Sequence, residues 1–225
     1  MFNFIFITGA GRCGTNLITG LLDGNDQIDV VPGEPTNYLG QVLRYNGLSQ
    51  NININHTSEI LSEIFTEVFA DDDDYMDIVE RIKKKISFFE EKNIKILTAN
   101  DFLSSICQAI FVKESGTAVI NLQNENIACL IEAFPNCKVI HMLRNPLTQL
   151  NSRYLFRHRI PSNYREGEFG EAFFRNYNSF MQAQIYENNN QVKVTRMEDL
   201  ITNPADTIKK ICSFKVCPVK ILWNQ

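Results

Sequence analysis

Histidine and tryptophan are scarce in this chain, and its cysteines follow no metal-binding spacing. The 225 residues contain three histidines, one tryptophan and six cysteines. No two cysteines form a C-x-x-C pair, and no cluster of cysteine and histidine has the spacing of a zinc site. We therefore expect no metal centre, and we expect the thiols to be reduced and mostly buried.

The chain also lacks an excess of positive charge and any long apolar run. Its formal net charge is -4 at pH 7, which disfavours a general nucleic-acid-binding protein. No apolar run approaches the length of a membrane-spanning helix, and the apolar start MFNFIFIT lacks the basic residues of a signal peptide. The sequence therefore predicts a cytoplasmic protein without a membrane span that does not bind nucleic acid. Nothing in it indicates an oligomeric state.

The sequence does contain an alternation of apolar strands and amphipathic helices. Residues 4–7 form a continuous apolar run, typical of a strand covered on both faces of a parallel sheet. Further strands are expected within 27–35, near 95, and at 117–122, 137–143 and 191–197, with a mostly helical stretch over 37–112. This alternation predicts a three-layer α/β/α fold with a central parallel sheet, as a single domain over residues 1–225. Ligands of such sheets bind at the carboxyl ends of the strands.

The first strand runs into a glycine-rich turn in FIFITGAGRCGTNLITGLLDG, residues 4–24. Gly9, Gly11 and Gly14 spell G-x-G-x-x-G, the pattern of a dinucleotide-binding turn. Glu34 follows Gly14 at about the separation of a ribose-binding acid. Gly9 and Gly14 also have the spacing of an ATP or GTP loop, but Thr15 stands in the place of its lysine, which disfavours an ordinary kinase or NTPase.

Three segments, in order along the chain, favour another interpretation. The first is Arg12-Cys13-Gly14-Thr15-Asn16 in the turn itself, where backbone N–H groups, a helix N-terminus and the Arg12 charge suit an anion. The second is KVIHMLRNPLTQLNSRY at 138–154, where Arg144 ends a strand and Ser152 stands eight residues later. Asn145 and Pro146 between them suit a helix start. The third is VKVTRMEDLITNPADTIKKI at 192–211.

These three segments resemble motifs of the sulfotransferase superfamily that uses 3′-phosphoadenosine 5′-phosphosulfate (PAPS). The arginine in the loop resembles the tyrosylprotein and bacterial carbohydrate-type members most closely. The resemblance implies a P-loop-like sulfotransferase fold. It also implies in-line transfer of a sulfuryl group to a hydroxyl or amine, without a metal. The acceptor would be a small molecule, a carbohydrate or a peptide hydroxyl.

The resemblance also implies a role for each residue. Arg12 would stabilise charge on the departing phosphate, and Glu34 would be the base that takes the acceptor proton. A carboxylate with an ordinary pKa is a weak base, so we expect burial to raise the pKa of Glu34. The residues implied in cofactor binding are Gly11, Arg12, Cys13, Gly14, Thr15, Asn16, Arg144 and Ser152.

The sequence departs from the family pattern in places. Cys13 and Asn16 replace hydroxyl residues, and INLQNEN at 120–126 has no lysine where many members carry one. The arginine-rich segment 153–165 could be a lid over the cofactor, an acceptor loop or a solvated helix end. Two other functions stay open at this point. One is an NAD(P)-dependent oxidoreductase using the glycine turn and Glu34, and the other is a non-catalytic nucleotide-binding protein on the same scaffold.

Overall fold

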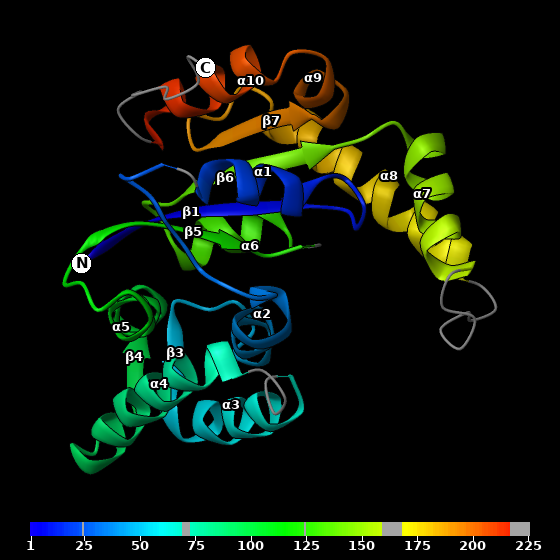
Figure 1. Ribbon diagram of the computed structural model, residues 1–225. Helices are drawn as coiled ribbons and strands as arrows, with labels where there is room; N and C mark the ends of the chain where they lie inside the picture. The colour runs from blue at the N-terminus through cyan, green and yellow to red at the C-terminus, as the bar shows by residue number, and fades with distance from the viewer. Residues whose placement is uncertain (24, 69–72, 124, 159–167, 217–225) are drawn as a thin grey trace.

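A computed structural model describes residues 1–23, 25–68, 73–123, 125–158 and 168–216. Five parallel strands form the central sheet in the order β2-β5-β1-β6-β7 (Figure 1). They are β1 (Phe2–Gly9), β2 (Asp29–Val30), β5 (Gly116–Asn121), β6 (Lys138–Leu143) and β7 (Val192–Arg196). Phe6 at the centre of the sheet pairs with Ile120 of β5 and Val139 of β6. Because every pairing is parallel, the carboxyl ends of the strands meet at one edge.

The central strand β1 divides its side chains between two apolar cores, since neighbours along a strand point to opposite faces. Phe4 and Phe6 enter one core, with ring centroids 5.8 and 4.8 Å from that of Phe134. Ile5 and Ile7 enter the other. The Ile face is covered by α1 (Thr15–Asp23), α9 (Met197–Thr202), α10 (Pro204–Ile211) and the π-helical turn η2 (Cys212–Val216), and the Phe face by α6 (Ile127–Ala133) and α8 (Glu168–Tyr186). The predicted three-layer α/β/α fold with a central parallel sheet is confirmed.

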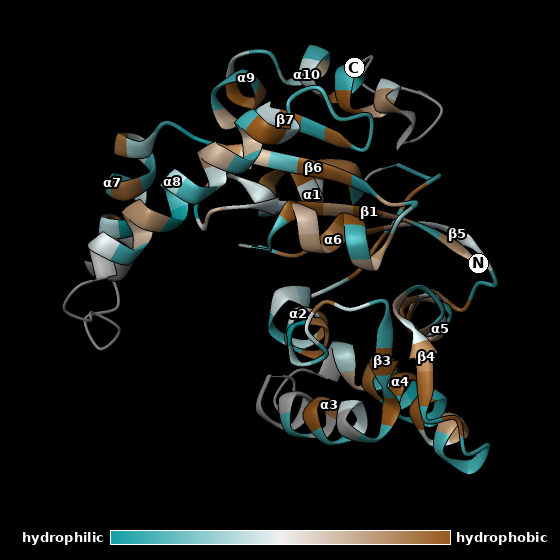
Figure 2. Ribbon diagram, turned by 180° about the vertical axis from the view of Figure 1, so that it is seen from behind, coloured by the Kyte–Doolittle hydropathy of each residue, from teal (hydrophilic) through white to brown (hydrophobic). Residues whose placement is uncertain are grey.

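The helical middle of the chain extends the core on the Phe face. It comprises α2 (Pro35–Tyr45), α3 (Ile54–Val68), α4 (Asp73–Glu91), α5 (Ala99–Phe111) and the antiparallel pair β3 (Asn51–Asn53) and β4 (Ile96–Thr98). Leu39 and Phe102 of these helices belong to the same buried cluster as Phe4 and Phe6. In Figures 1 and 2 this group lies beneath the parallel sheet. The strand near residue 95 was predicted, whereas β3 was not.

Two helices beyond the carboxyl edge of the sheet frame the site. Helix α7 (Pro146–His158) packs on α8, and both extend past β6 (Figure 1). Asn145 caps α7 as predicted, since its Oδ1 accepts hydrogen bonds from the backbone N of Leu147 at 3.0 Å and of Thr148 at 3.4 Å. No helix in the described ranges is long and apolar enough to cross a bilayer.

Candidate functional site

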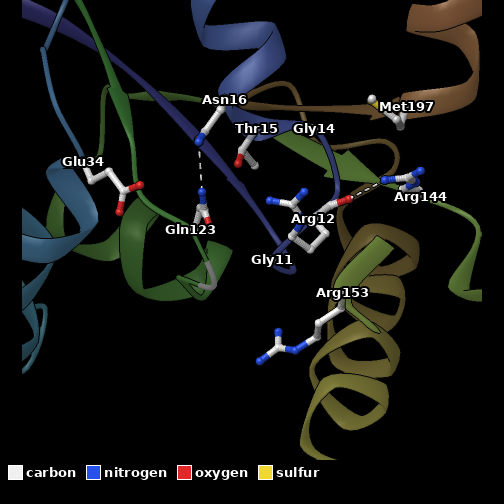
Figure 3. A pocket seen from close by; sticks show the side chains of 10 residues that line it. All are labelled: Gly11, Arg12, Gly14, Thr15, Asn16, Glu34, Gln123, Arg144, Arg153 and Met197. Carbon is white, nitrogen blue, oxygen red and sulfur yellow. Dashed lines mark hydrogen bonds between the residues drawn. The ribbon is translucent and has the colours of Figure 1, made fainter. Parts of the chain in front are cut away.

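A cavity of about 520 Å³ lies at the carboxyl edge of the sheet (Figure 3). This is where ligands of open parallel sheets bind, and its volume falls in the range of small-molecule sites, roughly 300–1,000 Å³. The loop after β1, the segment after β5, the start of α2, the helix α7 and the start of α9 all contribute to it. Its lining residues are Gly11, Arg12, Gly14, Thr15, Asn16, Glu34, Gln123, Arg144, Arg153 and Met197.

The loop between β1 and α1 depends on residues with positive φ. Gly9 has φ 144° and Gly14 has φ 92°. A Cβ on Gly9 would lie 2.4 Å from the backbone O of Met142, and one on Gly14 would lie 2.2 Å from Sδ of Met197. Gly9 therefore requires glycine for space as well as for conformation, because the Met142 backbone cannot give way, whereas Gly14 requires it for conformation, since the Met197 side chain can move. Arg12 has φ 72°, an uncommon conformation for a residue with a side chain, of the kind that clusters at functional sites.

Arg144 joins the end of β6 to this loop. Its Nη1 donates a hydrogen bond to the backbone O of Arg12 at 3.1 Å (Figure 3). Its Nε donates to Oγ1 of Thr148 at 3.3 Å. Glu198 of α9 accepts a hydrogen bond from the backbone N of Asn145 at 2.9 Å, which fixes the turn that carries Arg144. The two arginines that the sequence assigned to separate phosphate sites thus lie side by side in one cavity.

Arg153 adds a third guanidinium group from α7. Its Nη1 lies 3.6 Å from where a Cβ on Gly11 would stand. Of the arginine-rich segment 153–165, Arg153 lines the cavity, whereas Arg159 and Arg165 lie outside the described residues. Three guanidinium groups around one cavity suit a ligand with more than one anionic group, because each offers a planar set of donors to phosphate or sulfate.

The side of the cavity opposite Arg144 is built from amides. Oδ1 of Asn16 accepts a hydrogen bond from Nε2 of Gln123 at 3.0 Å (Figure 3). It also accepts one from Nδ2 of Asn121 at 2.7 Å. Oγ1 of Thr36 accepts from the backbone N of Gln123 at 2.9 Å and donates to the backbone O of Asn121 at 2.9 Å. Asn16 therefore links the start of α1 to the end of β5. The segment after β5 is the one in which the family pattern would have placed a lysine.

Glu34 reaches the cavity from the turn before α2, across from Arg144 (Figure 3). Its Oε2 accepts a hydrogen bond from Nδ2 of Asn37 at 3.0 Å. Glu34 is exposed, so the prediction that it is buried was wrong. Gly33, three residues after the second strand, has φ 74° and is itself exposed, so this turn carries Glu34 at the surface.

Two residues predicted to bind the cofactor do not line the cavity. Cys13 is 1% exposed in the core behind the loop. Burial raises the pKa of its thiol to about 12, with the nearby Arg144 charge opposing this, so the thiol stays neutral and packs against its neighbours. Ser152 is half-buried on α7. Its role stays a prediction, although the next residue, Arg153, does reach the cavity.

The sequence motifs assigned no role to several residues of the site. Gln123 stands two residues after the end of β5, and Met197 directly follows β7, both at the edge where side chains converge, and that position is a signal the sequence offered. Gln149 of α7 contacts the loop from behind. It stands four residues before Arg153, a spacing that places both on one helix face. Among the described residues, no group of three or more His, Cys, Asp or Glu side chains is arranged to hold a metal ion.

The sequence model of the Sulfotransferase family matches residues 4–220. The chain belongs to the sulfotransferase family. A search of curated proteins finds no significant match. Solved structures similar to this sulfotransferase include the sulfotransferase domain from the curacin biosynthetic pathway, with a TM-score of 0.59 and 17% identity over 98% of this chain and 76% of that one. The sulfotransferase from Alicyclobacillus acidocaldarius gives 0.55 and 16%, over 97% and 82%.

A mouse sulfotransferase complexed with PAP gives a TM-score of 0.50 and 14% identity, over 96% of this chain and 60% of that one. At such identities the likeness establishes the fold, which is the P-loop-like sulfotransferase fold that the sequence motifs implied. The oxidoreductase interpretation of G-x-G-x-x-G is not favoured, because the family accounts for the same glycines.

Proposed function

We propose that this sulfotransferase transfers a sulfuryl group from PAPS to a hydroxyl or amine of a small-molecule, carbohydrate or peptide acceptor. The observation that carries the proposal is the meeting of Arg12 and Arg144 in one cavity, joined by a hydrogen bond of 3.1 Å. The motifs assign these arginines to the two anionic ends of PAPS. The mouse sulfotransferase of the same fold is complexed with PAP, 3′-phosphoadenosine 5′-phosphate, which is the product of such a transfer, and this adds support.

The residues present fit such a donor. The cavity of about 520 Å³ has room for a nucleotide of this size. The loop offers its backbone N–H groups and the start of α1 to the 5′ end, as helix N-termini do for phosphate. Arg144 would bind the 3′-phosphate, with Ser152 as its predicted second ligand. Met197 gives the cavity one large apolar wall, suited to the face of a base.

The donor, when bound, supplies an activated sulfuryl group, and the protein has to position it and stabilise charge. Arg12 and Thr15 would stabilise the charge that develops on the departing 5′-phosphate, in the manner of phosphoryl-transfer sites. An arginine stays protonated and cannot readily give up its proton. Arg12 would therefore act by electrostatic attraction, and the leaving phosphate would depart as an anion.

Glu34 would take the proton of the acceptor. It lines the cavity on the side away from Arg144 (Figure 3), so an acceptor entering between them would meet a carboxylate on one side and the sulfuryl group on the other. The hydrogen bond from Asn37 fixes one carboxylate oxygen and leaves the other to face the acceptor. A general base acts only within hydrogen-bond reach of the proton it removes, roughly 3 Å.

A calorimetric titration tests the proposal. The protein is titrated with 3′-phosphoadenosine 5′-phosphate (PAP), NAD, NADP and ATP in parallel. Selective binding of PAP, with a Kd in the micromolar range, is the expected result. Tighter binding of NAD or NADP would contradict it. Binding of PAP without turnover across acceptors of all three classes would indicate a nucleotide-binding protein without catalysis.

A further inference from the structure

Gln149 is a buried amide with no place in the motifs, and it contacts the anion-binding loop from the protein side. It is 2% exposed on α7. Its Nε2 donates to the backbone O of Gly11 at 2.6 Å and lies 3.8 Å from Sγ of Cys13. Its Oε1 accepts a hydrogen bond from Nδ2 of Asn176, a residue of α8 that is 4% exposed. Every polar atom of this side chain is therefore used.

The bond to Gly11 determines which way the next peptide N–H points. In a trans peptide the C=O and N–H groups point in opposite directions. When the O of Gly11 points to Gln149 in the protein interior, the backbone N–H of Arg12 must point away from it, to the cavity side of the loop. Arg12 holds φ 72°, a conformation that persists only where surrounding contacts enforce it.

The backbone O of Gly11 decides which end of the Gln149 amide faces the loop. A carbonyl oxygen can only accept, so it selects Nε2 of Gln149, and Asn176 satisfies the other end by donating its Nδ2 to Oε1. The reversed amide would set Oε1 of Gln149 against the O of Gly11, and two acceptors repel. A relay of two buried amides thus runs from α8 through α7 to the loop.

We propose that Gln149, anchored by Asn176, is a positioning residue that presets the Arg12 N–H to bind the donor's 5′ anionic group. The assignment rests on the proposed function for the identity of that donor. The geometry itself, in which a buried amide orients the loop to bind an anion, applies to any phosphate or sulfate ligand of the cavity.

The test compares Gln149→Met and Asn176→Ala with the control Gln182→Met. Gln182 also lies on α8, and its Oε1 accepts a hydrogen bond from the backbone N of Ile127 at 2.7 Å rather than bonding to Gly11. The control therefore makes the same amide-to-thioether change without touching Gly11. All variants are neutral, so altered charge does not contribute. Two readouts are used on folded protein: the Kd for PAP by calorimetry, and the amide shift of Arg12 by NMR during titration with sodium sulfate.

The expected result is a Kd for PAP raised about tenfold or more by Gln149→Met, raised less by Asn176→Ala, and within about twofold of wild type for Gln182→Met. The sulfate-induced shift of the Arg12 amide signal should shrink in the same order.

Unchanged binding of PAP in Gln149→Met, or an equal loss of binding in Gln182→Met, would overturn the inference and leave the proposed use of PAPS intact. A third outcome is that wild type does not bind PAP, while sulfate shifts the Arg12 amide signal only in proteins that keep Gln149. The inference about Gln149 would then stand, and PAPS would be the wrong donor. A wild-type loop that bound neither would overturn both.

Discussion

The glycines around the loop differ in what they tolerate, and this difference can be measured. Gly9→Ala should destabilise the fold by at least about 2 kcal/mol, because the new Cβ would meet the backbone O of Met142 at 2.4 Å at a φ of 144°. Gly20→Ala is the matched control: it lies on α1, and nothing stands within 4 Å of its Cβ position. That change should stabilise the protein by roughly 0.5–1 kcal/mol. Urea denaturation checks both. A tolerated Gly9→Ala would contradict the loop geometry.

Glu34 offers a test that separates catalysis from cofactor binding. Glu34→Gln keeps the shape of the side chain and removes its basicity. It should lower kcat by about 10²–10⁴-fold and leave the Kd for PAP within about twofold, since Glu34 lies across the cavity from Arg144 (Figure 3). Steady-state kinetics with calorimetry measure the two quantities. If kcat fell less than about tenfold, another group would be the base.

At the scale of residues, the sequence predicted what local chemistry decides. Gly14, Arg12 and Arg144, which the motifs singled out, all line the cavity, because a turn and a strand end fix their positions, and their binding of a cofactor stays a prediction. The sequence did not allow the solvent exposure of the site's side chains or their long-range contacts to be predicted. Cys13 faces the core and Glu34 faces solvent, and both facts depend on which segments pack against the loop.

Helix α8 reverses the usual distribution of side chains between core and surface. Its buried side carries Ala172, Asn176, Ser179 and Ala183, whereas its exposed large apolar residues are Phe173, Phe174, Tyr177, Phe180, Met181 and Ile185. The buried polar residues have partners: Asn176 bonds to Gln149, and Ser179 bonds to His141 of β6. The inward face of α8 therefore makes hydrogen bonds to α7 and β6 in addition to packing contacts.

His141 should make stability depend on pH. Its Nε2 lies 2.9 Å from both the backbone O and Oγ of Ser179, and burial lowers its pKa to about 4. The unfolded chain, with an ordinary histidine pKa of about 6.5, therefore binds more protons than the folded one between these values. Stability from this group is complete above pH 6.5 and is lost as pH falls toward 4, on the order of 3 kcal/mol in all.

The variant His141→Gln isolates this effect. Glu125 lines a neighbouring cavity together with His141, and burial raises its pKa against the opposing Arg44 charge. Titration of Glu125 therefore makes the protein more stable as the pH falls, whereas titration of His141 makes it less stable. Comparing wild type with His141→Gln separates the two effects, because both proteins keep Glu125. The difference in unfolding free energy between wild type and His141→Gln should therefore shrink from pH 7 to pH 4. A constant difference would contradict the burial of a neutral imidazole.

At the scale of elements, apolar runs identified the strands and helix signals identified α7. The predicted strands at 117–122 and 137–143 correspond to β5 and β6, and Asn145 caps α7. β3 was missed because three residues, Asn51–Asn53, give no periodic pattern. The reversed polarity of α8 could not be foreseen, since its polar residues are buried by partners that lie far away in the sequence.

The whole molecule shares one large core between the parallel sheet and the helices α2 to α5. Phe6 of β1 and Phe102 of α5 are both fully buried in it. We therefore expect residues 1–225 to unfold as a single cooperative domain, with equal calorimetric and van't Hoff enthalpies. Phe102→Ala should cost about 3–5 kcal/mol and lower one transition as a whole. Two separate transitions, with only one moved by Phe102→Ala, would show that the helical part folds independently.

The most direct test of the central claim is a cycle of two ligands and one arginine, Arg144. Wild type and Arg144→Ala are titrated with PAP and with adenosine 5′-phosphate, which lacks the 3′-phosphate. If Arg144 binds the 3′-phosphate, wild type should prefer PAP by about tenfold or more, and Arg144→Ala should lose that preference. A preference for PAP that survived in Arg144→Ala, or its absence in wild type, would contradict the assignment of this cavity to PAPS.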